Sequence, residues 1–392
     1  MRRRRYRARP YRPARPEPSA PAARPGDTLA RLGGDEFVVL LDGLAAAEEA
    51  EALAARLGAT LESPFALDGQ EAAITTSIGV ALAESGRTTP TELLRDADVA
   101  LYQAKERGKA SYAVYDPGMG DSLRERVALE TDLRRALERD ELELHYQPIV
   151  ELVTGRIVSV EALARWNHPM RGLMPPDAFI PLAEETGLIG LLGQWVLAEA
   201  CRQGRTWQEQ EPAVPVVISV NLSARQFQSP RLVEEVERVL RMTGLMPERL
   251  KLELTESAVM ADPEAAVATL GQLKGLGVGL AIDDFGTGYS SLAYLRRLPV
   301  DSLKVDKRFV AGLGRDNGDT AIVEAVVGLA RTLGLGVVAE GVETAAHVAH
   351  LRELGCAFGQ GYHFGPPQPV AAVESLLTKV TYAVGPRVRR AS

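Results

Sequence analysis

From residue 142 onward, short apolar runs with the length of β-strands alternate with longer stretches of helical periodicity. The strand candidates are 142–150, 156–164, 216–222, 250–255, 278–283, 301–305, 335–339 and a short one near 356–360. The helix candidates between them are 177–186, 190–209, 231–242, 263–275, 289–297, 319–332 and 344–352. Roughly eight strands interleaved with helices over about 250 residues is the size and rhythm of a (β/α)-barrel. A doubly wound open sheet is the rival fold.

The chain before this block has its own αβ pattern, over residues 26–116, which closes at Asp116-Pro117-Gly118, a cluster of chain-breaking residues. Residues 122–139 predict an amphipathic connecting helix, because apolar residues recur near helical spacing. Those residues are Leu123, Val127, Leu133 and Leu137. We therefore expect an α/β protein. Its parts are a tail over 1–25, a partial α+β domain over 26–116, a linker and helix over 117–140, a TIM-barrel-like domain over 126–376 and a tail over 377–392.

Composition supports a globular protein with an unusual N-terminal tail. The 392 residues are 46% hydrophobic and 25% charged, which suits two packed domains. Residues 1–25 hold nine arginines against the single acid Glu17, within a chain of net charge −7. Such an Arg/Pro/Ala segment cannot build a core, and we expect it to be disordered. A polyanion-binding arm is one interpretation; an incidental extension or a misassigned start is the one we favour.

Other features of the composition bear on location. The sequence has no apolar run long enough for a membrane span, and the N-terminus lacks the apolar region of a secretory signal peptide. Cys201 and Cys356 are far apart and show no metal-ligand spacing, so we interpret them as buried thiols of a reduced, cytoplasmic protein. We expect no nucleic-acid polymer as partner.

Polar residues recur where the apolar strand runs end. They are Glu161, Asn221, Glu253, the pair Asp283 and Asp284, Lys304 with Asp306, and Glu340. In a parallel barrel the C-terminal strand ends converge on one mouth, where such enzymes keep their sites. Carboxylates gathered there would repel one another unless cations lay among them. Because the donors are oxygens, without His or Cys, Mg²⁺ or Mn²⁺ is expected rather than zinc.

Each residue also has a simpler interpretation when it is taken alone. A single Glu or Asp at a strand end is often a helix cap, and Asn221 is equally well a turn residue. Gln147 and Arg165 alone would be ordinary surface residues. Lys304 is harder to explain this way, because a buried ammonium is costly without anionic partners. The joint pattern at six strand ends favours a site.

The motifs in this block resemble those of EAL-type cyclic di-GMP phosphodiesterases, in the order of that family. They are Tyr146-Gln147-Pro148-Ile149, Glu161-Ala162-Leu163-Ala164-Arg165-Trp166, Asn221-Leu222-Ser223, Glu253-Leu254-Thr255-Glu256-Ser257, Asp283-Asp284-Phe285-Gly286-Thr287-Gly288, Leu303-Lys304-Val305-Asp306, Ala339-Glu340-Gly341-Val342-Glu343 and Gly359-Gln360-Gly361-Tyr362. The resemblance implies two-metal hydrolysis of cyclic di-GMP to linear pGpG, with Mg²⁺ or Mn²⁺. A receptor that binds cyclic di-GMP without cleaving it is the alternative, and a homodimer formed through the EAL domain is expected.

The resemblance also implies a role for each matching residue. One metal would be held by Glu161, Asn221, Glu253 and Asp283, and the second by Asp283, Asp284 and Glu340. Lys304 would orient or help deprotonate the attacking water. Gln147, Arg165 and Gln360 would lie near the substrate, with Arg165 suited to a phosphate oxygen. Glu256 would brace the loop that begins at Asp284.

The first block resembles the second half of a GGDEF (diguanylate cyclase) domain. Its hairpin motif contains Gly33-Gly34-Asp35-Glu36-Phe37, with Gly33-Gly34 expected as a tight turn. Thr76–Val80 and Asp96–Lys105 fit the same family, and Arg24 and Asp27 have the spacing of its inhibitory product-binding motif. The stretch that normally precedes the hairpin, with a central strand and a metal-binding Asp, is replaced by the Arg/Pro tail. We therefore expect no cyclase activity, an unpaired sheet edge, and a regulatory or vestigial role. Binding of GTP to activate the barrel is the alternative.

Overall fold

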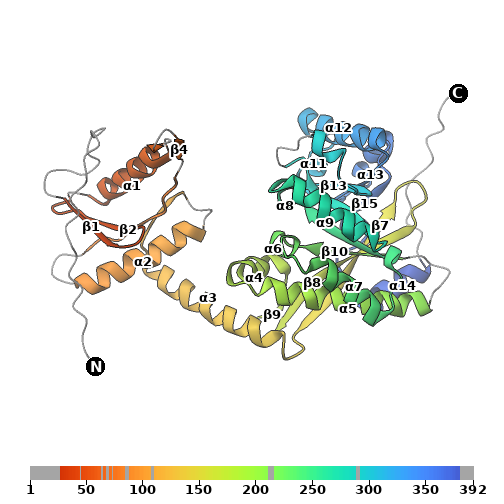
Figure 1. The fold of residues 1–392 in the computed structure, drawn as a ribbon, viewed down its shortest axis with the longest axis horizontal. Coiled ribbons are helices and arrows are strands. Elements are labelled where there is room, and N and C mark those ends of the chain that lie inside the picture. The colour runs from red at the N-terminus through yellow and green to blue at the C-terminus, as the bar shows by residue number, and fades with distance from the viewer. Residues whose placement is uncertain are drawn as a thin grey trace. The chain divides into compact units, whose positions relative to one another are not determined.

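The computed structural model describes residues 27–44, 46–62, 65–67, 70–72, 74–83, 88–106, 110–210, 216–287 and 292–379. The expected tail over 1–25 lies outside these ranges. Of the tail expected over 377–392, residues 377–379 instead form the end of a helix, and the rest lies outside the described ranges. The chain divides into two compact units, residues 1–129 and 130–392 (Figure 1). Among the described helices, none has the length and apolar character that crossing a bilayer requires.

The described strands of the first unit form three separate two-stranded sheets. Its elements are β1 (Thr28–Gly33), β2 (Glu36–Leu40), α1 (Ala47–Glu62), β3 (Phe65–Leu67), β4 (Gln70–Ala72), β5 (Ile78–Val80), α2 (Pro90–Glu106) and β6 (Tyr112–Val114). Strands β5 and β6 are parallel and α2 connects them. Gly79 lets β5 lie against α2, because a Cβ there would stand 2.1 Å from the Ala97 carbonyl oxygen.

The expected hairpin is present as the antiparallel pair β1–β2, but its turn is one residue later than predicted. Gly33 is the last residue of β1 and pairs with Glu36, so the two-residue turn is Gly34-Asp35. Gly34 has φ +53°, in the left-handed region that such a turn requires and glycine tolerates.

The connecting helix α3 runs over Pro117–Ala136, so the predicted bounds 122–139 were wrong at both ends. The cluster at 116–118 begins the helix rather than closing the preceding block. Asp116 Oδ1 accepts a hydrogen bond from Gly118 N at 2.9 Å, as a capping residue does. Proline is tolerated in the first turn because its missing N–H would have no partner there.

In the second unit, eight strands close into a barrel, which excludes the open-sheet alternative. Its strands are β7 (Leu142–Glu151), β8 (Ile157–His168), β10 (Val217–Leu222), β11 (Leu250–Thr255), β12 (Gly279–Phe285), β13 (Ser302–Val305), β14 (Gly336–Ala339) and β15 (Phe358–Gln360). Neighbouring strands pair from β10 through β15 to β7 and β8, and the β8–β10 pairing closes the ring. The short strand β9 (Gly172–Met174) extends the sheet from β8.

The barrel is not wholly parallel, contrary to the expectation from the sequence. Strand β7 is antiparallel to both of its neighbours, β8 and β15. Glu151 N donates to the Arg156 carbonyl at 2.9 Å, so a tight turn joins β7 to β8. A turn this short can join only antiparallel strands, because a parallel connection needs a crossover.

Helices surround the barrel in Figure 1. Together with short 3₁₀ turns (η), all of them except the last lie between successive strands. They are η1 (Pro176–Ala178), α4 (Ile180–Thr186), α5 (Ile189–Gln210), α6 (Ala224–Phe227), α7 (Leu232–Thr243), η2 (Pro247–Arg249), α8 (Glu256–Met260), α9 (Pro263–Gly275), α10 (Leu292–Leu295), α11 (Lys307–Ala311), α12 (Asn317–Leu333), α13 (Ala345–Glu353) and α14 (Val370–Lys379). The strands are buried on both faces. On β11, for example, Leu252 and Leu254 are fully buried on one face and Glu253 on the other.

Candidate active site

Six polar residues lie on neighbouring strands around the barrel. They are Glu161 on β8, Asn221 on β10, Glu253 on β11, Asp283 on β12, Lys304 on β13 and Glu340 directly after β14. In the strand register Asn221 pairs with Glu253, whereas Asp283 pairs with Thr255, two residues further along β11. Glu161 lies within β8 and not at the strand end that the sequence predicted, because β8 continues to His168, where it pairs with β9.

The Lys304 ammonium is the centre of this group. Its Nζ lies 2.6 Å from Glu253 Oε2 and from Glu340 Oε1, and 3.3 Å from Glu161 Oε2 and from Asp283 Oδ2. The Lys304 side chain is 1% exposed. Four carboxylates from four strands or strand ends therefore meet at one buried cation.

Amide side chains form a second layer of contacts on Glu161. Asn221 Nδ2 donates to Glu161 Oε1 at 2.6 Å, and Gln360 Nε2 donates to Glu161 Oε2 at 2.6 Å. Gln360 Nε2 also donates to Gln147 Oε1 at 2.9 Å, and Gln147 Nε2 to the Gly365 carbonyl at 3.0 Å. Gln360 Oε1 is buried with no hydrogen-bond partner in the described structure, so it is an acceptor available within the site.

Burial and crowding separate the pKa values of these acids. Burial, reinforced by Glu161 and Asp283, raises the pKa of Glu253 to about 7 against the opposing effect of Lys304. Burial likewise raises the pKa of Glu340 to about 8, with Asp283 and Glu161 adding to it. Burial also acts on Glu161, but Lys304 and the two amides outweigh it and lower its pKa.

At Lys304, burial shifts the pKa in the direction opposite to its effect at Glu253 and Glu340. Burial would lower its pKa, but the surrounding carboxylates outweigh burial and raise the pKa well above its usual value. The ammonium therefore keeps its proton among these acids and is a hydrogen-bond donor.

Asp284 extends the acidic group beyond Lys304. Carboxylate oxygens of Asp283, Asp284 and Glu340 all lie within 4.8 Å of one another. Asp284 has φ +54°, an uncommon backbone conformation for a residue other than glycine. Burial and the neighbouring Asp283 raise its pKa. The strained turn brings two consecutive carboxylates to the same site.

Glu256 and Arg165 lie beside this group. Glu256 is 1% exposed, and its Oε2 accepts a hydrogen bond from Gly286 N at 2.9 Å, which ties α8 to the turn after Asp284. Residues 288–291 of that loop lie outside the described ranges. Arg165 is on β8, and its Nη1 donates to the Ala164 carbonyl at 2.8 Å. Burial lowers the pKa of Arg165, against nearby Tyr362 and acidic groups.

The donor set fits hard divalent cations. Five carboxylates (Glu161, Glu253, Asp283, Asp284 and Glu340) face one ammonium, so the group has a formal charge of −4 when all five acids are ionised. Two divalent cations would balance that charge. Oxygen donors from Asp, Glu and Asn suit Mg²⁺ or Mn²⁺.

One acid of this region was named in the sequence motif but was not assigned a role. Asp306 shares a hydrogen bond with Asp284, and its Oδ1 accepts from Arg308 Nε at 3.1 Å. Its position two residues after Lys304, at the end of β13, is the signal that could have identified it.

The predicted site residues of the first unit lie at a hairpin tip. Asp35 is in the turn and Glu36 begins β2, and both are exposed, as are Gly33, Gly34 and Phe37. Asp27 lies just before β1, whereas Arg24 lies outside the described residues, so their pairing stays a prediction.

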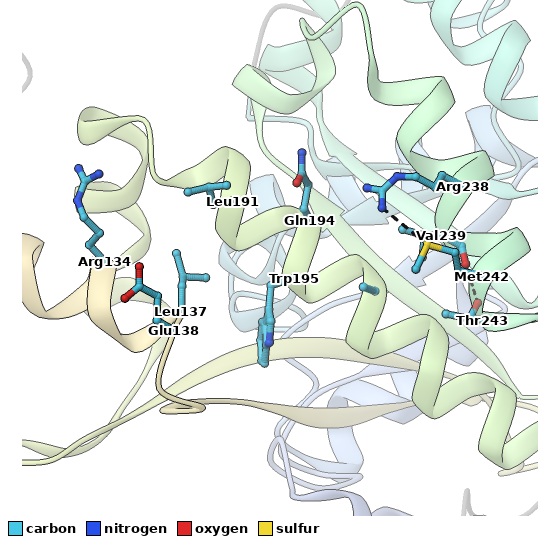
Figure 2. Close-up of a pocket in the computed structure, with 11 residues that line it drawn as sticks. Arg134, Leu137, Glu138, Leu191, Gln194, Trp195, Arg238, Val239, Met242 and Thr243 are labelled. Carbon is cyan, nitrogen blue, oxygen red and sulfur yellow. Dashed lines mark hydrogen bonds between the residues drawn. The ribbon is translucent and has the colours of Figure 1, made fainter.

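A hollow of about 500 Å³ lies elsewhere in the second unit. Figure 2 shows its lining: Arg134 at the end of α3, Leu137 just after that helix, Trp195 on α5 and Met242 on α7. None of the strand-end acids lines it, so the charged cluster, and not this hollow, is the candidate active site.

Comparisons with known proteins match both parts of the chain. The family model described as the EAL domain matches residues 130–367, and the one described as the diguanylate cyclase GGDEF domain matches residues 20–111. An EAL domain therefore follows a GGDEF domain.

Individual relatives carry matching names. The bifunctional diguanylate cyclase/cyclic di-GMP phosphodiesterase MucR of Pseudomonas aeruginosa is 48% identical over 354 residues, covering 90% of this chain and 51% of MucR. Cyclic di-GMP phosphodiesterase NbdA of the same organism is 43% identical over 366 residues, covering 93% and 46%. The solved PaMucR phosphodiesterase in complex with c-di-GMP has a TM-score of 0.61 and 52% identity, covering 63% of this chain and 99% of that chain. The chain spans about half the length of these curated relatives.

Proposed function

This chain belongs to the EAL domain family, and on that premise we propose that its barrel hydrolyses cyclic di-GMP to linear pGpG. One observation carries the proposal: the Lys304 Nζ lies within 3.3 Å of four carboxylates on neighbouring strands. A receptor needs contacts to its ligand, but it has no need for so costly a concentration of buried charge.

In this proposal, Glu161, Asn221, Glu253 and Asp283 would hold one cation, and Asp283, Asp284 and Glu340 would hold a second. Bound Mg²⁺ or Mn²⁺ supplies neutralisation of the phosphate and a lowered pKa for water. Lys304 orients the attacking water. Because the carboxylates hold its proton in place, it donates a hydrogen bond rather than acting as the base.

The amides and the arginine position the substrate. Arg165 binds a phosphate oxygen, for which a guanidinium is well suited. Gln360 Oε1, which has no hydrogen-bond partner in the described structure, accepts a hydrogen bond from the substrate, while Gln360 Nε2 donates to Glu161 and Gln147. Glu256 fixes the turn at Gly286 and so keeps Asp283 and Asp284 in place.

The test is the metal-dependent appearance of pGpG when the purified chain is incubated with cyclic di-GMP. We expect turnover with Mg²⁺ or Mn²⁺, and a loss of about 10²–10³-fold in Glu161→Gln, comparable to removal of one preorganised active-site group. Glu237→Gln, an exposed site on α7, is the matched control and should keep its rate. Binding of cyclic di-GMP without pGpG formation would favour the receptor, and near-normal turnover in Glu161→Gln would refute the metal assignment.

Two further parts of the proposal concern the whole chain. The GGDEF domain is catalytically inactive, because Asp35 and Glu36, two adjacent acids on one exposed hairpin, provide few ligands for the cations that nucleotide transfer needs, and its role is regulatory. The chain pairs with a second copy through the EAL domain, which the mass measured by light scattering tests.

A further inference from the structure

His347 lies under the loop that carries Glu340, and no role has yet been assigned to it. It is in the first turn of α13 and is 7% exposed. Its Nδ1 accepts a hydrogen bond from Glu343 N at 3.4 Å, and the Gly341 carbonyl accepts one from the ring. One buried imidazole thus contacts the backbone on both sides of Val342.

The loop from Gly341 to Glu343 is otherwise attached on its opposite side. Val342 N donates to the Gln360 carbonyl, and His363 N to the Val342 carbonyl, each at 2.9 Å. Gly341 has φ +66°, and a Cβ there would lie 2.6 Å from the Lys307 Cβ. The chain therefore turns sharply directly after Glu340, and the direction of that turn sets where the Glu340 carboxylate points.

The hydrogen bonds assign the ring a neutral state, with Nδ1 as acceptor and Nε2–H as donor. Burial lowers the pKa of His347. Glu343 opposes this effect, whereas Arg315 and His350 lower the pKa further. An imidazolium could not accept from Glu343 N, so the environment favours the state that holds both contacts.

From this geometry we propose that His347 is a positioning residue, which braces the Gly341–Glu343 loop and thereby holds Glu340 ready to bind a cation. The inference rests on the proposed metal role of Glu340 and extends it to a residue outside the charged cluster. Groups that orient metal ligands typically contribute about ten- to hundred-fold to affinity. A glutamine offers the same acceptor and donor pair, whereas a leucine of similar size offers neither.

The test is calorimetric titration of the metal-free, full-length chain with Mn²⁺, which does not depend on hydrolysis. His347→Leu should weaken Mn²⁺ binding by about ten- to hundred-fold, while His347→Gln stays within about three-fold of the parent. Glu353→Gln, at an exposed site at the end of the same helix, is the matched control and should also stay near the parent. If His347→Leu does not fold, His347→Asn, which is too short to reach both backbone groups, provides the same comparison.

Parental Mn²⁺ affinity in His347→Leu or in His347→Asn would overturn the inference. So would an equal loss in His347→Gln and His347→Leu. If the parent binds Mn²⁺ but forms no pGpG, the proposed function fails while this comparison still decides the role of His347.

Discussion

At the scale of single residues, the site depends on Lys304, whose Nζ lies within 3.3 Å of carboxylates from four strands or strand ends. An ammonium between apolar neighbours indicated buried anionic partners, and the structure provides four of them. The family resemblance also named the acids and amides that the structure brings together. The position of His347 against the Gly341–Glu343 backbone could not be predicted, because that contact depends on where a helix packs against a loop.

Replacement of Lys304 should separate catalysis from binding. Lys304→Ala is expected to lower kcat by about 10²–10³-fold, the usual cost of removing one preorganised hydrogen-bond donor. Affinity for cyclic di-GMP, measured for both proteins in metal-free buffer, should change far less. Lys251→Met, on the same face of β11 as Glu253, is the control and should keep its kcat. An effect of Lys304→Ala confined to affinity would contradict the assigned role.

The raised pKa values of Glu253 and Glu340 predict that cation binding depends on pH. In the metal-free protein these pKa values are about 7 and about 8, so at about pH 6 both groups hold protons that a cation must displace. As pH rises through 7 and 8 their ionised forms destabilise the metal-free fold, and bound cations offset this cost. The increase in Tm caused by Mg²⁺ should therefore be larger at about pH 8.5 than at about pH 6.

The control for that experiment is Asp283→Asn, which removes a shared ligand and should show a small Mg²⁺ effect at both pH values. An equal increase in Tm at the two pH values in the parent protein would show that the buried carboxylates do not exchange protons for cations.

At the scale of elements, all eight barrel strands were predicted, because strands buried on both faces appear as continuous apolar runs. The antiparallel direction of β7 was not predicted, because an apolar run has the same pattern in a parallel and in an antiparallel strand. The short link between β7 and β8 was the available signal. Helices α6, α8 and α11 were missed because four or five residues are too few to show a helical period.

Glu256 links α8 to the turn after β12, so its replacement tests whether this contact holds the turn in position. Glu256→Ala leaves the Gly286 N–H without this acceptor and should lower turnover by about ten-fold or more, as for other groups that orient metal ligands. Glu256→Gln retains an acceptor oxygen and should keep most of the activity. Equal activity of Glu256→Ala and the parent protein would show that the turn holds its position without this contact.

At the scale of the whole molecule, the two units differ in how their acids are arranged. In the barrel, carboxylates from separate strands converge on Lys304. In the first unit, Asp35 and Glu36 lie side by side on an exposed hairpin. Among the described residues, the acids whose carboxylate oxygens all lie within 4.8 Å of one another are Asp283, Asp284 and Glu340, which belong to the second unit. Helix α3 begins in the first unit, and its last turn is buried in the second at Leu133 and Ala136.

This difference predicts that the chain does not make cyclic di-GMP from GTP. Transfer between nucleotides requires cations held against the phosphates, and two exposed acids on one hairpin provide few ligands for them. The barrel would hydrolyse any cyclic di-GMP that the GGDEF domain made, so the assay should use the Glu161→Gln variant, in which cyclic di-GMP would accumulate. We expect none after incubation with GTP and Mg²⁺. Accumulation that disappears in the double variant Glu161→Gln and Asp35→Asn would show instead that the hairpin acids are active, because the second substitution leaves the barrel unchanged.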